Sequence, residues 1–139
     1  MVQRLLEDRT GMFVSAVLTP DSQRRLLEQV PPVHGTVYAH HVTMAYDPEP
    51  DVLEKYRPLE GQRIRVPVTA ICADEKGQAV LVGVESENEY PHITISVAEG
   101  VEAKYSNELL ASQHADMQHV NIFTLEAVVT IEPLETTPV

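Results

Sequence analysis

Two short stretches of the sequence share one pattern: HVTMAY at residues 41–46 and HITISV at residues 92–97. Each begins with His, an apolar residue and Thr, and apolar side chains recur at every second position, as in a β-strand with one buried face. Side chains two apart in a strand point to the same side. In the first stretch, the two expected faces are His41, Thr43 and Ala45 on one side and Val42, Met44 and Tyr46 on the other.

The second stretch divides in the same way, with His92, Thr94 and Ser96 opposite Ile93, Ile95 and Val97. Each strand then has an apolar face for a core and a second face that begins with an imidazole and a hydroxyl. Set side by side, the two strands would form a groove lined by two His and two Thr. One His-x-Thr match is weak evidence, but two matches on alternating strands are much harder to obtain by chance. The alternative is a pair of ordinary, half-exposed histidines at strand starts.

The remaining sequence predicts a single α+β domain over residues 1–139, with a frayed tail from about residue 132. Sparse aromatic residues and abundant Val, Leu, Ile and Ala suit sheets covered by short helices. Further strands are expected at 11–19, 63–71, 79–85 and 119–131, and helices at 20–30, 52–56 and 107–112. A turn at 74–77 joins two of these strands, so the sheet is expected to be antiparallel.

Composition limits the partners. The formal net charge is −11, and no Lys- or Arg-rich run offers a track for a long nucleic acid. A nucleic-acid substrate is therefore expected to be a nucleotide, a short oligomer or an exposed RNA end. No apolar run is long enough to span a bilayer, and Glu7 and Asp8 lie where a signal peptide would be apolar, so a soluble, cytoplasmic protein is expected. The single cysteine, Cys72, is expected in the core.

The paired His and Thr residues suit the opening of a phosphate ester. A neutral imidazole takes a proton from water, and an imidazolium gives one to the departing sugar oxygen. Hydroxyl and backbone donors of Thr43 and Thr94 would hold the phosphoryl oxygens as charge builds on them. Acid, base and oxyanion donors are then all protein groups, so the scheme needs no cofactor and no metal. We predict His41 and His92 as the acid–base pair.

At these residues the sequence resembles the 2H phosphoesterase superfamily, whose hallmark is two His-x-Thr/Ser motifs on paired strands. The stretch from Pro91 to Leu110 is similar to the cyclic phosphodiesterase domains of fungal-type tRNA ligases and related RNA-repair proteins. In that group, a glycine-containing loop and a Ser-Asn pair follow the second motif, matched here by Gly100, Ser106 and Asn107.

The resemblance implies a two-lobed fold with antiparallel sheets facing a central cleft. It also implies hydrolysis of a 2′,3′-cyclic phosphate or a related ester, although members include 2′-5′ phosphodiesterases and nucleases of cyclic oligonucleotides. The two histidines are only 51 positions apart, fewer than in larger members. Loops that grip an RNA body are then missing, which favours a small substrate.

Other residues are weaker site candidates. Tyr105, Ser106 and Asn107 lie where a loop enters a helix, so they are expected either to contact a phosphate or simply to cap the helix. His40 should point away from His41 in a regular strand and is interpreted as structural. His114 and His119 lack the spacing of a metal site. Arg63 and Arg65 share one strand face, where they either steer phosphate or guard a sheet edge.

Two further functions remain open from the sequence. The same cleft could capture a nucleotide or another phosphorylated ligand without cleaving it. A structural or partner-binding domain is the third hypothesis, in which the His-x-Thr strands merely begin sheets. The third predicts that the imidazoles of His41 and His92 point away from each other.

Overall fold

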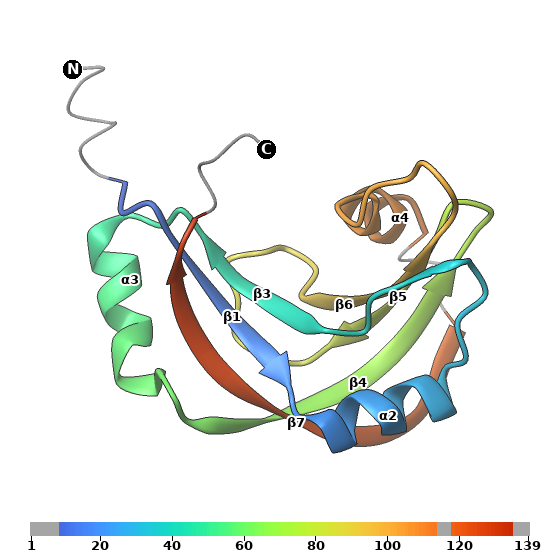
Figure 1. The fold of residues 1–139 in the computed structure, drawn as a ribbon, viewed down its shortest axis with the longest axis horizontal. Helices are drawn as coiled ribbons and strands as arrows, with labels where there is room; N and C mark the ends of the chain where they lie inside the picture. Colours follow the sequence, from blue (N-terminus) through green and yellow to red (C-terminus); the bar gives the residue numbers. More distant parts are fainter. Residues whose placement is uncertain (1–8, 114–117, 135–139) are drawn as a thin grey trace.

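The computed structural model describes residues 9–113 and 118–134, with backbone alone for 118–122 (Figure 1). The strands are β1 (Met12–Leu18), β2 (Thr36–Val37), β3 (His41–Tyr46), β4 (Arg63–Ala73), β5 (Gly77–Val82), β6 (His92–Val97) and β7 (Gln118–Pro133). The helices are α2 (Pro20–Gln29), α3 (Pro50–Tyr56) and α4 (Tyr105–Gln113), with a 3₁₀ turn, η1, at Arg57–Leu59. None of the helices described here has the length and apolar character needed to cross a membrane.

The strands form one antiparallel sheet that closes on itself. Its order is β2-β6-β3-β1-β7-β4-β5, and β5 also pairs with β6, so that six strands complete a ring with β2 attached to β6. The expected α+β class is confirmed. Two lobes with separate sheets are not confirmed, because the described strands all belong to a single hydrogen-bonded sheet.

Local sequence explains most element boundaries. Helix α2 begins after Thr19, whose hydroxyl accepts the Ser22 N–H, and Pro20 occupies the first turn, where its missing N–H costs nothing. Strands β3 and β6 have the predicted bounds. Strand β5 starts two residues earlier than predicted, because the Asp74 carboxylate accepts the N–H groups of Lys76 and Gly77 and tightens the turn.

The predicted tail also differs. Strand β7 continues to Pro133, and the Leu134 N–H donates to the Gly11 carbonyl at 2.8 Å, because β7 pairs with β1 along the whole length of β1. Residues 135–139 of the predicted tail lie outside the described part of the chain. Strand β2 is an addition to the predicted elements, and at two residues it is too short to leave a periodic pattern in the sequence.

The main core lies on one face of the sheet and is completed by two helices. Helix α2 contributes Leu26 and Val30 to this core, and α3 contributes Leu53 and Tyr56. A smaller cluster lies under α4, where Leu109 and Leu110 pack with Cys72 and Ala79. Cys72 is buried, as predicted. Figure 1 shows α4 well separated from α2 and α3, near the start of β5, where Gly77 lies against Tyr105.

Both His-x-Thr strands contain a β-bulge directly after the threonine. Opposite β1, Thr43 pairs with Ser15 but Ala45 pairs with Val14, which leaves Met44 as the extra residue. Opposite β5, the register passes from Thr94 to Ser96 and leaves Ile95 as the extra residue. An extra residue shifts the alternation of side chains beyond it by one position.

The bulges correct the predicted faces of three residues. Ala45 and Ser96 were expected beside the histidines and threonines, but both are buried. Tyr46 was expected in the core, but its side chain is 69% exposed. The period-two rule holds through His41–Thr43 and His92–Thr94 and fails beyond them, because each strand is interrupted by its extra residue.

Candidate functional site

A pocket of about 340 Å³ opens on the sheet face opposite the main core. It is lined by Phe13, Tyr38, His40, His41, Thr43, Tyr46, Asn88, His92, Thr94, Ala103, Lys104 and Asn107. The four residues singled out in the two His-x-Thr motifs therefore border one pocket. His41 and His92 therefore do not point apart, as the hypothesis of a purely structural domain predicts.

The pairing of β3 with β6 sets the order of these four side chains. Val42 pairs with Ile93 in antiparallel register. In an antiparallel pair, the residue before Val42 lies opposite the residue after Ile93, and the residue after Val42 lies opposite the residue before Ile93. His41 is therefore on the Thr94 side and Thr43 on the His92 side. The two imidazoles occupy diagonal positions, with a hydroxyl beside each.

His92 has a defined proton arrangement. Its Nδ1 lies 2.8 Å from the Tyr90 carbonyl oxygen. Because a carbonyl only accepts, Nδ1 carries a proton and Nε2 is the nitrogen that exchanges one with a ligand. Burial lowers the pKa of His92 below its ordinary value, and the bond to Tyr90 opposes part of that shift because it stabilises the imidazolium.

His41 is still more strongly held in its neutral form. Its pKa is lowered from 6.5 to about 4, first by burial and then by repulsion from the imidazoles of His40 and His92. The Phe13 ring meets the His41 ring edge-on, with 5.7 Å between the ring centroids. These contacts shield one side of His41 from water and fix its orientation.

His40 lies at the pocket, contrary to its predicted position on the opposite face. The Nδ1 atoms of His40 and His41 are 3.0 Å apart, so one of them donates to the other. Strand β3 begins only at His41, and the preceding Ala39 has a left-handed φ of 48°. That backbone turn redirects the chain before the strand, so strand alternation does not extend back to His40.

The second group of predicted site residues lies at the start of α4, and only one of its three members lines the pocket. Asn107 lines the pocket. Ser106 is buried, and its hydroxyl lies 2.8 Å from the Thr94 hydroxyl, so it contacts a candidate residue rather than the open pocket. Tyr105 turns away, because its hydroxyl donates to Asp74 at 2.6 Å. A Cβ at Gly77 would come within 2.9 Å of the Tyr105 ring, so this close approach requires glycine.

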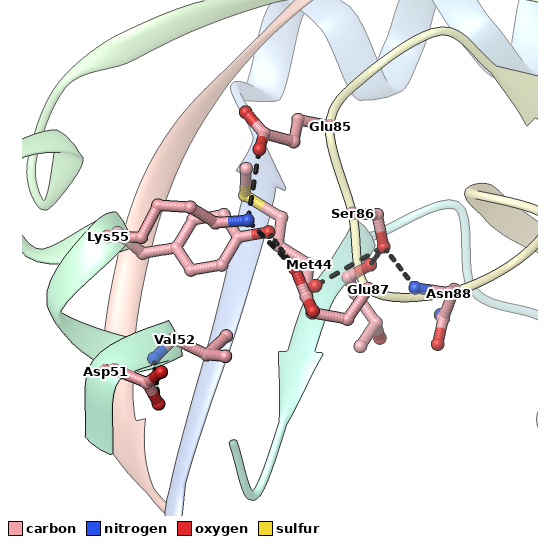
Figure 2. Close-up of polar contacts among 10 residues, drawn as sticks. Met44, Asp51, Val52, Lys55, Glu85, Ser86, Glu87 and Asn88 are labelled. Atoms are coloured by element: carbon pink, nitrogen blue, oxygen red, sulfur yellow. Dashed lines mark hydrogen bonds and ion pairs between the residues drawn. The ribbon is translucent and has the colours of Figure 1, made fainter. Parts of the chain in front are cut away.

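The loop between β5 and β6, residues 83–91, forms part of the pocket wall, which the sequence motifs did not indicate. Lys55 of α3 bridges Glu85 and Glu87 (Figure 2), with its ammonium 3.1 Å from each carboxylate. The Tyr56 hydroxyl donates to Glu87 at 3.0 Å. The Ser86 hydroxyl donates to the Thr43 carbonyl at 2.8 Å and accepts the Asn88 N–H at 3.0 Å. These contacts hold the loop that places Asn88 at the pocket.

Three aromatic side chains at the pocket were also missed: Phe13, Tyr38 and Tyr46. Phe13 could have been found, since it alternates with the buried Val14 in β1. Tyr46 could not, because its position depends on the bulge at Met44. Tyr38 precedes β3, where no periodic pattern applies.

The described residues contain no group of three or more His, Cys, Asp or Glu side chains arranged to hold a metal ion. His114 lies outside the described residues, and only the backbone of His119 is described. The expectation about these two histidines therefore stays a prediction.

Comparison with protein families adds an independent observation. The model of the fungal tRNA ligase phosphodiesterase domain matches residues 22–133, a span that includes both His-x-Thr strands. The chain belongs to this family. This family is one of the 2H phosphoesterase families, so the resemblance inferred from the two motifs is confirmed. Membership of the fungal tRNA ligase phosphodiesterase family supports phosphodiester hydrolysis as the general activity. Among curated proteins, no match was found.

The contact between His40 and His41 yields a testable prediction for this family member. Replacing His40 by Gln removes a group that disfavours the His41 imidazolium, so the pKa of His41 should rise above about 4. It should stay below 6.5, because burial is the larger cause and remains. Titration of the imidazole ring protons by NMR measures the change.

His34→Gln is the matched control, because the His34 ring contacts the Asp74 carbonyl and not His41. This control should leave the pKa of His41 where it is. An unchanged or lower pKa of His41 in His40→Gln would contradict the assigned cause.

Proposed function

We propose that this pocket hydrolyses a cyclic or 2′-linked phosphodiester of a nucleotide or RNA end, with His41 and His92 as general base and general acid. The observation that carries the proposal is the convergence of two half-buried imidazoles and two threonines on one pocket. Family membership supports the same reaction class. The substrate and the histidine roles are our inference.

The proposed step balances with one water molecule. The water oxygen attacks phosphorus while the neutral Nε2 of one histidine takes its proton. The bond between phosphorus and the departing sugar oxygen breaks, and the Nε2–H of the other histidine protonates that oxygen. The diagonal placement of His41 and His92 suits groups that act on opposite sides of the phosphorus.

We assign the base role to His41 and the acid role to His92. His41 lies beside a second imidazole that disfavours its cation, whereas the Tyr90 carbonyl favours the cation of His92. Opposed environments of this kind separate the roles of two similar groups. For His41 to accept through Nε2, its Nδ1 must carry the proton and donate to His40.

The remaining lining fits a nucleotide phosphate. Thr43 has no partner for its hydroxyl among the described residues, so this hydroxyl is free to donate to a phosphoryl oxygen. Asn107 and Lys104, whose ammonium pairs with Glu102 at 3.1 Å, lie at the start of α4 and add an amide and an ammonium to the lining. Tyr38 and Tyr46 offer ring faces on which an unpaired base can stack. The volume is at the lower end for small-ligand sites.

A non-catalytic binding module is the second candidate function. One observation supports it: the pKa values of both histidines are lowered, so both are mainly neutral at pH 7 in the free protein. The free protein then lacks a general acid until a phosphate binds. A bound phosphate raises both pKa values, since negative charge favours imidazolium. Stoichiometric binding without product would favour this candidate.

The direct test is turnover of 2′,3′-cyclic nucleotides, 2′-5′ dinucleotides and small cyclic oligonucleotides, with product analysis. His41→Ala and His92→Ala should each lower kcat by at least about 100-fold on the cleaved substrate, because each removes a proton-transfer group. EDTA should leave the parental rate intact. Parental rates in both variants, or loss of activity on chelation, would refute the proposal.

The pH dependence follows from the two lowered pKa values. In the free enzyme, the acid must be protonated, and its protonated fraction falls as pH rises through a pKa below 6.5. The optimum of kcat/KM should therefore lie below pH 6.5, and the kcat optimum should lie at higher pH because bound phosphate raises both pKa values. A kcat/KM optimum above about pH 7 would contradict the assignment.

Thr43→Val tests the oxyanion donor with little change in shape. Loss of the hydroxyl should lower kcat on the order of 10- to 1000-fold, while Thr43→Ser should retain most activity. Thr94→Val is less clean, because it also removes the partner of the buried Ser106 hydroxyl and should cost about 1–3 kcal/mol of stability. Equal rates for Thr43→Val and Thr43→Ser would exclude a donor role for this hydroxyl.

A further inference from the structure

The Nδ1 atoms of the two motif histidines contact different kinds of partner. Nδ1 of His92 contacts the Tyr90 carbonyl, which can only accept, so the backbone fixes the proton position on His92. Nδ1 of His41 contacts Nδ1 of His40 at 3.0 Å. An imidazole nitrogen can either donate or accept, so the backbone does not fix the proton position on His41. The side chain of His40 decides it.

The rings of His40 and His41 meet through their nitrogens. Their planes are 81° apart and their centroids are 5.1 Å apart, which excludes stacking of the ring faces. With the Nδ1 atoms at 3.0 Å, a proton on either nitrogen is within hydrogen-bond reach of the other. The Phe13 ring meets His41 at an angle of 89°. His41 therefore cannot turn its Nδ1 elsewhere without losing both contacts.

The pocket has no carboxylate to take the place of His40. His40 is the one hydrogen-bond partner of the His41 ring among the described residues. Enzymes often orient a catalytic histidine with a carboxylate that accepts from its Nδ1–H. The described lining of the pocket contains neither Asp nor Glu. In this pocket, the group that selects the proton position of His41 is therefore a second imidazole.

Backbone hydrogen bonds on both sides of its side chain place His40 at the pocket. The His40 carbonyl accepts the Leu18 N–H at 2.9 Å, and the Ala39 N–H donates to the Thr94 carbonyl at 2.8 Å. Ala39 is buried, whereas the His40 side chain is exposed. Substitution of an exposed side chain whose backbone is held in this way changes stability little. The role of His40 can therefore be tested without loss of the fold.

We propose that His40 is a positioning residue that accepts the Nδ1 proton of His41 and so keeps Nε2 of His41 free to take a proton from water. This inference rests on the proposed function for the role of His41 as base. If His40 donated instead, Nε2 of neutral His41 would carry the proton and could not accept another. The role concerns neutral His41. It is separate from the repulsion between imidazolium ions that lowers the pKa of His41.

NMR of the free protein measures the proton position directly, because two-bond couplings between ring protons and ¹⁵N distinguish a protonated nitrogen from a bare one. At about pH 8, His41 and His92 are neutral, since their pKa values are lowered. In the parent protein, His41 should carry its proton on Nδ1, as His92 does. This readout does not depend on activity.

Two variants of similar shape separate the acceptor from the bulk of the side chain. In His40→Asn, the amide oxygen lies as many bonds from the backbone as Nδ1 and can accept, so His41 should keep its proton on Nδ1. In His40→Leu no acceptor remains. The proton of His41 should then shift towards Nε2, the position that histidine favours in water. His40→Ala makes the same test if His40→Leu does not fold.

Kinetics on a cleaved cyclic nucleotide tests the consequence for catalysis. In His40→Leu, kcat should fall on the order of 10- to 100-fold, because a large share of the molecules then holds the wrong tautomer. KM should change far less, since both tautomers can bind phosphate. His40→Asn should retain most of the parental kcat. His34→Gln is the control outside the pocket, and it should keep both the parental proton position and the parental kcat.

Three results would overturn the role of His40: a proton on Nε2 of His41 in the parent, a parental proton position or kcat in His40→Leu, or a kcat of His40→Asn as low as that of His40→Leu. The last result would assign the loss to the imidazole itself and not to its acceptor. If the proton shifts in His40→Leu but the parent cleaves no cyclic ester, the positioning role stands and the proposed function fails. If the parent cleaves and His40→Leu matches it in both readouts, only the positioning role fails.

Discussion

The candidate site depends on one strand pairing, that of Val42 in β3 with Ile93 in β6. This pairing joins two segments that are far apart in sequence. Strand β6 also pairs with β5 on its other side, and the two pairings together close the ring of strands. Because the partners are flanked by His and Thr on both strands, the same register that buries Val42 and Ile93 sets the two imidazoles diagonally on the opposite face. Core packing and site geometry are thus fixed together.

The two halves of the site repeat the same local structure. Each bulge residue presents its carbonyl to a neighbouring segment: Met44 accepts from the Glu87 N–H at 2.7 Å, and Ile95 accepts from the Tyr38 N–H at 2.8 Å. These segments carry Asn88 and Tyr38 to the pocket. The extra residue of a bulge is not paired with the neighbouring strand. Here the carbonyl of each extra residue accepts a hydrogen bond from a neighbouring segment instead. The walls of the pocket therefore follow from the bulges.

The sequence was sufficient where the alternation of side chains is unbroken, in the first three residues of β3 and of β6. The bounds of β3 and β6, the pairing of His with Thr on one face and the family could all be predicted from residues 41–46 and 92–97. The bulges could not, since no residue type marks Met44 or Ile95 as unpaired. His40 was misplaced because the left-handed Ala39 breaks the alternation. Arg25 and Arg63 line one pocket, which the sequence did not indicate because their proximity depends on how α2 packs against the sheet.

The central claim is that His41 and His92 act together on one phosphate. A crystal structure of the protein with a nucleoside 2′-phosphate product tests it most directly. We expect the phosphate between the Nε2 atoms of His41 and His92, with the Thr43 hydroxyl on a non-bridging oxygen. A phosphate bound elsewhere, with the histidine pocket empty, would contradict the claim.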